Sequence, residues 1–165
     1  MTIQTIIEYP DPRLREHSQP VTRFDHRLKQ TVTDLIETMH DAKSIGLCAP
    51  QIDVREQVLV MDLSDDQSTP EVFVNPKIID RKGFGLIEER CVSVPGVSAI
   101  VMRAAQVRVQ AQSATGETFE CDLTGMHAMC LQHEMDHFDG KLVADRMNWF
   151  RRKRLQSRMK QAATA

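Results

Sequence analysis

Hydrophobic residues recur with helical spacing near the start of the chain, within residues 25–43. The apolar side chains there follow one another at intervals of four, three, one and three positions and are Leu28, Val32, Leu35, Ile36 and Met39. Because these intervals place them on one face of an α-helix, the pattern predicts an amphipathic helix that ends near residues 44–46.

Two further helices are predicted in the last third of the chain. One covers about residues 124–139 and stops at Gly140, a residue that readily adopts the left-handed conformation after a helix. The other begins near residue 145 or 148 and ends near residue 160, with basic residues opposite an apolar side. That apolar side consists of Met147, Phe150 or Arg151, Leu155 and Met159.

The region between the first two helices is predicted to form short β-strands. Residues 58–61 are a continuous apolar run, which indicates a buried strand. The other predicted strands are 72–74 with 78–79, 84–89, 97–101, 106–111 and 118–123, with a turn at Thr115-Gly116. Residues 9–14 contain two prolines and are expected to be extended or turn. This order predicts an α+β fold, in which short antiparallel or mixed strands surround a central helix, with an N-terminal and a C-terminal helix.

The composition is that of an ordinary globular chain. With 165 residues, 41% hydrophobic and 27% charged, it fits a single domain over residues 1–165. The sequence shows no signal-peptide pattern and no apolar run near the roughly 20 residues of a membrane span. We therefore expect a cytoplasmic protein with no membrane and no DNA partner. Its four cysteines are expected to be reduced thiols, core residues or metal ligands.

Charge is unevenly distributed along the chain. The net charge is −2, but residues 145–165 carry seven Lys or Arg and one acid, which leaves residues 1–144 at about −8. The basic C-terminal helix predicted over residues 146–165 therefore has two interpretations: a solvated face, or an electrostatic contact with ribosomal RNA.

Residues 132–137, Gln-His-Glu-Met-Asp-His, contain two histidines four positions apart with an acid after the first. On a helix, His133 and His137 share a face, so both can bind one metal ion, and Glu134 can reach a water at that ion. Met126, Met129 and Cys130 continue the same stripe, whose alternative interpretation is a core face.

A site of this kind needs a third protein ligand, and the usual downstream positions do not supply one. The position after Gly140 in the extended protease pattern is Val143, and no glutamate follows Glu134. Cys91 is favoured, because it lies where a strand-like stretch breaks at Pro95-Gly96. The other candidates are Cys48, Cys121, Cys130, His17, His26, His40 and His127.

Three stretches together resemble the peptide deformylase family. They are residues 44–51 (Ser-Ile-Gly-Leu-Cys-Ala-Pro-Gln), residues 89–93 (Glu-Arg-Cys-Val-Ser) and residues 132–137. The resemblance extends over nearly the whole chain. It implies an enzyme that removes the N-formyl group from nascent N-formylmethionyl peptides, and a deformylase-like fold around the central helix.

The resemblance also implies roles for individual residues. Cys91, His133 and His137 would bind the metal, usually Fe²⁺ and replaceable by Zn²⁺, Ni²⁺ or Co²⁺. Glu134 would be the general base. The remaining catalytic positions would be Gly46, Gln51 and the backbone N–H of Val92. The substrate-binding positions would be Ile45, Ile87, Glu89, Met126, Met129 and Cys130.

The chain departs from the family pattern at several positions. Arg90 and Ser44 stand where the family has glycine, Cys48 where it has alanine, and Ser98 where it often has arginine. Arg90 is the largest change, because it could narrow the peptide channel or pair with a substrate carboxylate. The alternatives to an ordinary deformylase are a paralogue with altered N-acyl peptide specificity and a non-catalytic, metal-stabilised ribosome-binding module.

Overall fold

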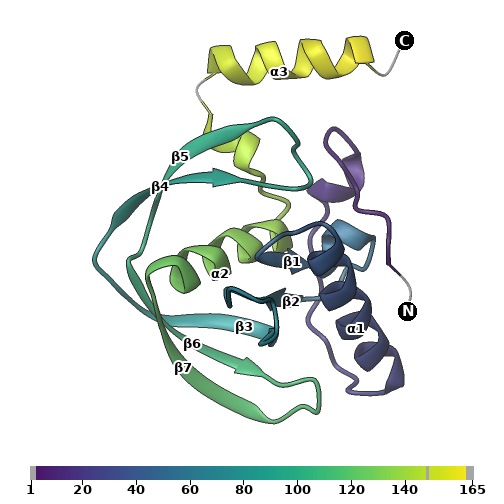
Figure 1. Cartoon of the computed structure of the whole chain (residues 1–165), viewed down its shortest axis with the longest axis vertical. Helices are drawn as coiled ribbons and strands as arrows, with labels where there is room; N and C mark the ends of the chain where they lie inside the picture. The colour runs from purple at the N-terminus through teal and green to yellow at the C-terminus, as the bar shows by residue number, and fades with distance from the viewer. Residues whose placement is uncertain (1–2, 148, 163–165) are drawn as a thin grey trace.

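The computed structural model describes residues 3–147 and 149–162 and confirms the α+β fold. An antiparallel sheet has the strand order β1-β2-β3-β6-β7, and β4 and β5 form a separate hairpin. Helix α2 lies between the two sheets, α1 lies beside β1 and β2, and α3 crosses above β5 (Figure 1). The helices are α1 (His26–Asp41), α2 (Gly125–Phe138) and α3 (Trp149–Ala162), and the 3₁₀ helices are η1 (Pro12–Arg15), η2 (Ala49–Ile52) and η3 (Val143–Arg146). The strands are β1 (Gly46–Cys48), β2 (Val58–Met61), β3 (Glu71–Lys82), β4 (Gly85–Arg90), β5 (Ser98–Arg103), β6 (Gln106–Gln112) and β7 (Thr118–Thr124).

The predicted helices and most of the predicted strands are confirmed. Asp25 begins α1 by accepting hydrogen bonds from the N–H groups of Arg27 and Leu28, at 2.9 and 3.3 Å. Helix α2 is followed by Gly140, whose φ of +67° matches the predicted left-handed stop. The two segments predicted around residues 72–79 form one strand, β3, because the chain passes Pro76 with a shift in register and continues pairing with β6.

The structure differs from the prediction at three places. Residues 12–15 form a 3₁₀ helix, which tolerates Pro12 at its first position because no N–H is needed there. Strand β1 was not predicted, since three residues are too few to show a period. Of the two starts predicted for the C-terminal helix, the one near residue 148 agrees with α3. A start at Arg146 is wrong, because that residue ends η3 and Met147 is extended (φ −76°, ψ 152°).

Helix α2 separates the main core from the site. Ala128, Leu131 and Phe138 pack with residues of β6 and β7 in one hydrophobic cluster. The side-chain amide of Gln132 fixes the helix to the β5–β6 turn: its Oε1 accepts from Ala104 N–H and its Nε2 donates to Ala104 O, both at 3.0 Å. The stripe that carries His133 and His137 lies on another side of the helix, toward Cys91 after β4 and toward Cys48 of β1.

Only part of the predicted apolar side of helix α3 packs against the rest of the protein. Met147 and Leu155 pack against the cluster that contains Val143 and Ala144, whereas Phe150 is 77% exposed, contrary to the prediction. Asn148 and residues 163–165 lie outside the described residues, as do the contacts of Arg151 and Met159. Among the described helices, none is both long enough and apolar enough to cross a membrane.

Candidate metal centre and active site

Three potential metal ligands meet beside α2. Cys91 follows the end of β4, and His133 and His137 project from successive turns of α2. The ligand atoms of the three residues all lie within 4.8 Å of one another, and Cys91 Sγ is 3.4 Å from His137 Nε2. One thiol and two imidazoles leave a position for water or substrate on a four-coordinate ion, so the donor set fits a divalent transition metal.

Glu89 orients His133. Its Oε2 lies 2.8 Å from His133 Nδ1, so Nε2 is the nitrogen left to face Cys91 and His137. Arg103 holds the same carboxylate with two hydrogen bonds, of 2.6 and 2.9 Å, and also pairs with Asp136. Although burial raises the pKa of Glu89, hydrogen bonds from His133 and Arg103 outweigh it and lower that pKa to about 2.

The two histidines have opposite electrostatic environments. Burial, followed by the charge of His133, lowers the pKa of His137 to about 3, so its imidazole stays neutral and able to bind metal. Burial also lowers the pKa of His133, but hydrogen bonds with Cys91 and Glu89 outweigh it and raise the pKa well above its ordinary value. The groups around His133 that stabilise a proton on its imidazole would also stabilise a metal cation bound beside it.

Glu134 lies within the site and is almost fully buried, with 4% exposed. Burial raises the pKa of its carboxyl above the ordinary value. Its Oε2 has no hydrogen-bond partner among the described residues, which is costly for a buried oxygen unless a water or a reacting group occupies the site. Gly46 makes room for it, because a Cβ there would lie 2.8 Å from Glu134 Oε1 and 2.7 Å from Cys130 Sγ.

The amide of Gln51 is held in one orientation. Its Oε1 accepts the backbone N–H of Cys48 at 2.9 Å, so its Nε2 must be the end that points toward Ser93 Oγ (3.1 Å) and Cys91 Sγ (3.6 Å). Gln51 is 1% exposed and belongs to η2, directly after β1. The site thus contains a preoriented N–H donor beside the potential metal ligands.

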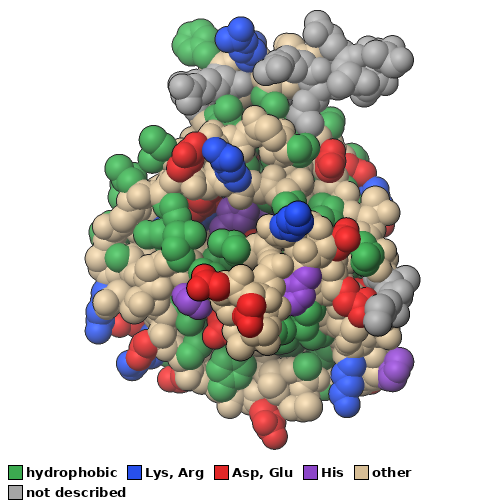
Figure 2. All heavy atoms as spheres, in the orientation of Figure 1, with side chains coloured by type: hydrophobic (Ala, Val, Ile, Leu, Met, Phe, Trp, Pro, Cys, Tyr) green, Lys and Arg blue, Asp and Glu red, His purple; other side chains and the backbone are tan. Residues whose placement is uncertain are grey.

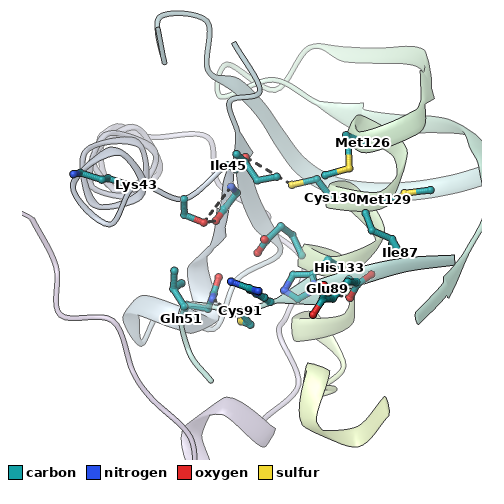
Figure 3. A pocket seen from close by; sticks show the side chains of 16 residues that line it. Lys43, Ile45, Gln51, Ile87, Glu89, Cys91, Met126, Met129, Cys130 and His133 are labelled. Atoms are coloured by element: carbon teal, nitrogen blue, oxygen red, sulfur yellow. Dashed lines mark hydrogen bonds and ion pairs between the residues drawn. The ribbon is translucent and has the colours of Figure 1, made fainter. Parts of the chain in front are cut away.

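A cavity of about 410 Å³ opens onto these groups. Figure 2 shows the corresponding hollow, with a histidine at its floor and basic side chains on its rim. Figure 3 shows Gln51 and Cys91 at one end and Met126, Met129 and Ile87 at the other. The candidate site residues that line it are Ile45, Gly46, Gln51, Ile87, Glu89, Cys91, Val92, Met126, Met129, Cys130, His133 and Glu134. His137 does not line the cavity and is buried, with 1% exposed.

Several residues of the site had no assigned role in the sequence analysis. Ser93 is fully buried and accepts from Gln51, and Arg103 holds Glu89. Cys48, considered there as a candidate third ligand and as a departure from the family pattern, forms a second close group with Glu134 and His137. Ser93 lies in the sequence motif around Cys91, so a role in the site could have been predicted for it. No sequence pattern indicated a role for Arg103, because its contact with Glu89 depends on the pairing of β4 with β5.

The remaining candidates for the third ligand lie elsewhere. Cys121 packs against the main core and His40 pairs with Asp62 at 3.2 Å. Within the described part of the chain, neither these two residues nor His17, His26 or His127 belong to a group of three potential ligands. The thiol of Cys130 faces Ile45 O at 3.7 Å, at the wall of the cavity.

Comparison with known proteins gives one consistent result. The family model for polypeptide deformylase matches residues 3–153. The peptide deformylase of Neisseria gonorrhoeae is 41% identical over 160 residues, which are 97% of this chain and 96% of the relative. That of Cellvibrio japonicus is 44% identical over 161 residues, 96% of this chain and 95% of the relative.

Solved structures agree with the sequence relatives. A crystal structure of a peptide deformylase from Legionella pneumophila superimposes with a TM-score of 0.92 at 39% identity, covering 99% of this chain and 96% of that one. The chain therefore belongs to the polypeptide deformylase family, which consists of metal-dependent hydrolases that remove the formyl group from the N-terminal methionine of formylated peptides.

Proposed function

We propose that this chain hydrolyses N-formylmethionyl peptides at a centre formed by Cys91, His133 and His137, with Glu134 as general base. The observation that carries the proposal is the convergence of one thiol and two imidazoles within 4.8 Å, beside the buried carboxylate of Glu134, whose Oε2 has no hydrogen-bond partner among the described residues. A structural metal site would need neither that carboxylate nor an open cavity.

The proposed reaction begins with proton removal by Glu134. When bound, a divalent metal at this centre polarises the formyl carbonyl and lowers the pKa of a water molecule there. Glu134 takes the proton from that attacking water and later gives it to the leaving amine, so that formate and a free N-terminus are released. Because burial raises the pKa of Glu134, its carboxylate holds a proton more readily than an exposed one would.

Negative charge that develops on the formyl oxygen needs donors. We assign this role to Nε2 of Gln51, which hydrogen bonds with Cys48 and Ser93 hold in place, and to the backbone N–H of Val92. Gly46 acts by leaving space for Glu134. Donors fixed in position before the reaction stabilise such charge without reorganisation, and one of them contributes about 3 kcal/mol in comparable enzymes.

The methionine side chain of the substrate would occupy the apolar end of the cavity. Met126, Met129, Cys130, Ile87 and Ile45 line that part, and thioethers pack well against another methionine because they are flexible and polarizable. Glu89 also lines the cavity, but its carboxylate is occupied by Arg103 and His133, so we assign it to orienting the metal ligand.

We propose Fe²⁺ as the native metal, as the resemblance to the family implies. Zn²⁺, Ni²⁺ or Co²⁺ should be able to substitute, because a thiolate–imidazole set binds several divalent ions. The test is metal analysis of protein prepared without oxygen, together with formate release from formyl-Met-Ala. One iron per chain and formate release in proportion to it are expected, and Cys91→Ser should lose both. Full metal content in Cys91→Ser would contradict the assignment of this ligand.

The whole chain is proposed to act as one cytoplasmic domain, with α3 as a contact for the ribosome. Arg152, Lys153 and Arg154 follow one another on α3, and Lys153 lies 4.3 Å from the ring centroid of the exposed Trp149. Replacing the three basic residues by Gln should weaken co-sedimentation with ribosomes, most clearly at low salt. Unchanged co-sedimentation would reject this contact while leaving the deformylase proposal intact.

A further inference from the structure

The rim of the active-site cavity carries two basic side chains that no other part of the proposed mechanism uses. Arg90 is the last residue of β4 and immediately precedes Cys91, and Lys43 lies in the turn between α1 and β1. Both are exposed and both line the cavity. Figure 3 shows Lys43 across the cavity from Ile87, a residue of β4, the strand that ends at Arg90.

Neither cation is neutralised within the described part of the chain, where Arg90 and Lys43 form no ion pair or side-chain hydrogen bond. By contrast, Arg103, the buried arginine of this region, binds Glu89 and Asp136 at 2.6 and 2.9 Å. An unpaired guanidinium at the edge of a cavity presents a planar fork of donors that matches a carboxylate. Arg90 is therefore available to a ligand.

The nearby acidic residues do not neutralise the positive charges of Arg90 and Lys43. The carboxylate of Glu89 is occupied by Arg103 and His133, and Glu134 is buried at the floor of the cavity. Glu88 is exposed on the rim but forms no ion pair with Arg90. Asp65 and Asp66 line an adjoining hollow, which reaches Lys43 and not Arg90.

A formylated peptide carries no charge at its N-terminus, so in a peptide whose C-terminus lies far from the cavity, charge selection at the rim acts on the side chains that follow the methionine. We propose that Arg90, assisted by Lys43, makes this enzyme prefer formylmethionyl peptides with an aspartate or glutamate in one of the two positions after the methionine. This inference rests on the proposed function, because the peptide must enter this cavity with its formyl group at the centre formed by Cys91, His133 and His137.

The experiment measures formate release from matched peptides in which the second or third residue is Asp, Asn or Lys. With wild-type protein at low salt, the Asp peptide is expected to exceed its Asn counterpart about three- to fivefold in kcat/KM, chiefly through KM, as for an exposed ion pair. The Lys peptide should be the poorest of the three. The differences should shrink at high salt, where exposed charges are screened.

Substitutions distinguish the effect of Arg90 on peptide preference from the effect of the protein's overall charge. Arg90→Gln should abolish most of the preference, Arg90→Lys should restore part of it, and Lys43→Gln should reduce it. Arg81→Gln removes the same charge from an exposed position of β3 outside the cavity and should leave it unchanged.

Two results would overturn the inference while formate release remains intact. One is equal kcat/KM for Asp and Asn peptides with the wild-type protein, a result that does not depend on whether any variant folds. The other is a changed selection: a preference for Asp that persists in Arg90→Gln, or a preference for Lys peptides, which would assign selection to Asp65 and Asp66. Absence of formate release from every peptide would reject the proposed function and this inference together.

Discussion

Glu89 Oε2 lies 2.8 Å from His133 Nδ1, and the same carboxylate receives two hydrogen bonds from Arg103. All three side chains are buried or nearly so, with 6% of Glu89, 12% of His133 and 7% of Arg103 exposed. Glu89 therefore fixes which nitrogen of His133 faces Cys91 and His137, the other proposed metal ligands.

Replacement of Glu89 by Gln should weaken metal binding about 10- to 100-fold, because His133 loses its charged partner. It should also lower the free energy of unfolding, since the guanidinium of Arg103 loses its principal partner in a buried position. Competition with a chelator measures the first effect and urea unfolding the second. Glu88→Gln, one residue away and exposed, is the control for both; equal metal affinity in the two variants would contradict the role of Glu89.

Replacement of Gln51 by Ala should lower kcat by about 10²- to 10³-fold while the metal remains bound, because an oriented donor to the formyl oxygen is lost. Ser93→Ala removes a hydrogen-bond partner of Gln51 but keeps the bond from the Cys48 N–H, so a smaller decrease is expected. Steady-state kinetics with metal analysis distinguish the two. A loss of metal in Gln51→Ala, rather than of kcat, would indicate that the amide supports Cys91 instead.

Gly46→Ala is expected to remove most activity, because the new Cβ would lie 2.8 Å from Glu134 Oε1 and 2.7 Å from Cys130 Sγ. The double variant with Cys130→Ala relieves one contact but leaves the other, so it should recover stability more than kcat. Gly85→Ala is a suitable control, since its Cβ would meet only the flexible end of Met129, at 3.1 Å. Normal kcat in Gly46→Ala would show that Glu134 does not need its present position.

The ion pair of Asp145 with Arg15 should make stability depend on acid pH. Burial raises the pKa of Asp145, but hydrogen bonds from Arg15 and from the Leu142 N–H outweigh it and lower the pKa below its ordinary value. Because the folded-state pKa is the lower one, its stabilisation is present above about pH 4 and is lost as the pH falls through the folded value.

Asp145→Asn should therefore reduce the free energy of unfolding at neutral pH by about 1 kcal/mol, a value limited by the partial exposure of the pair. The difference from wild type should disappear in acid. Urea unfolding at several pH values measures both, and Asp139→Asn, which breaks an exposed pair with Lys141, should change little at any pH. A constant difference at every pH would mean that the charge of Asp145 is not what stabilises the fold.

Local spacing explains why most of the fold could be predicted. Helices α1 and α2 carry their apolar residues at helical intervals, and β2 is a continuous apolar run, so local pattern and packing agree. Strand β1 has three residues and no period, and its pairing with β2 is decided by the tertiary structure. The position of Phe150 could not be predicted, because the spacing of α3 does not show which part of the helix meets the core.

The site was predictable only in part for the same reason. His133 and His137 are four residues apart on one helix, so their convergence follows from helical geometry. Cys91 is 46 residues from His137 along the chain, and spacing alone left several thiols and histidines as alternatives. The contact of Glu89 with Arg103 depends on the β4–β5 hairpin, and that of Gln51 with Ser93 on two segments 42 residues apart.

The most direct test of the account is formate release from a formyl-Met peptide by Glu134→Gln, compared with wild type at equal metal content. We expect this variant to keep its metal, because Glu134 is not assigned as a ligand, and to release formate at least about 10²-fold more slowly, because the general base is lost. Formate release at the wild-type rate by the metal-loaded variant would contradict the proposed mechanism.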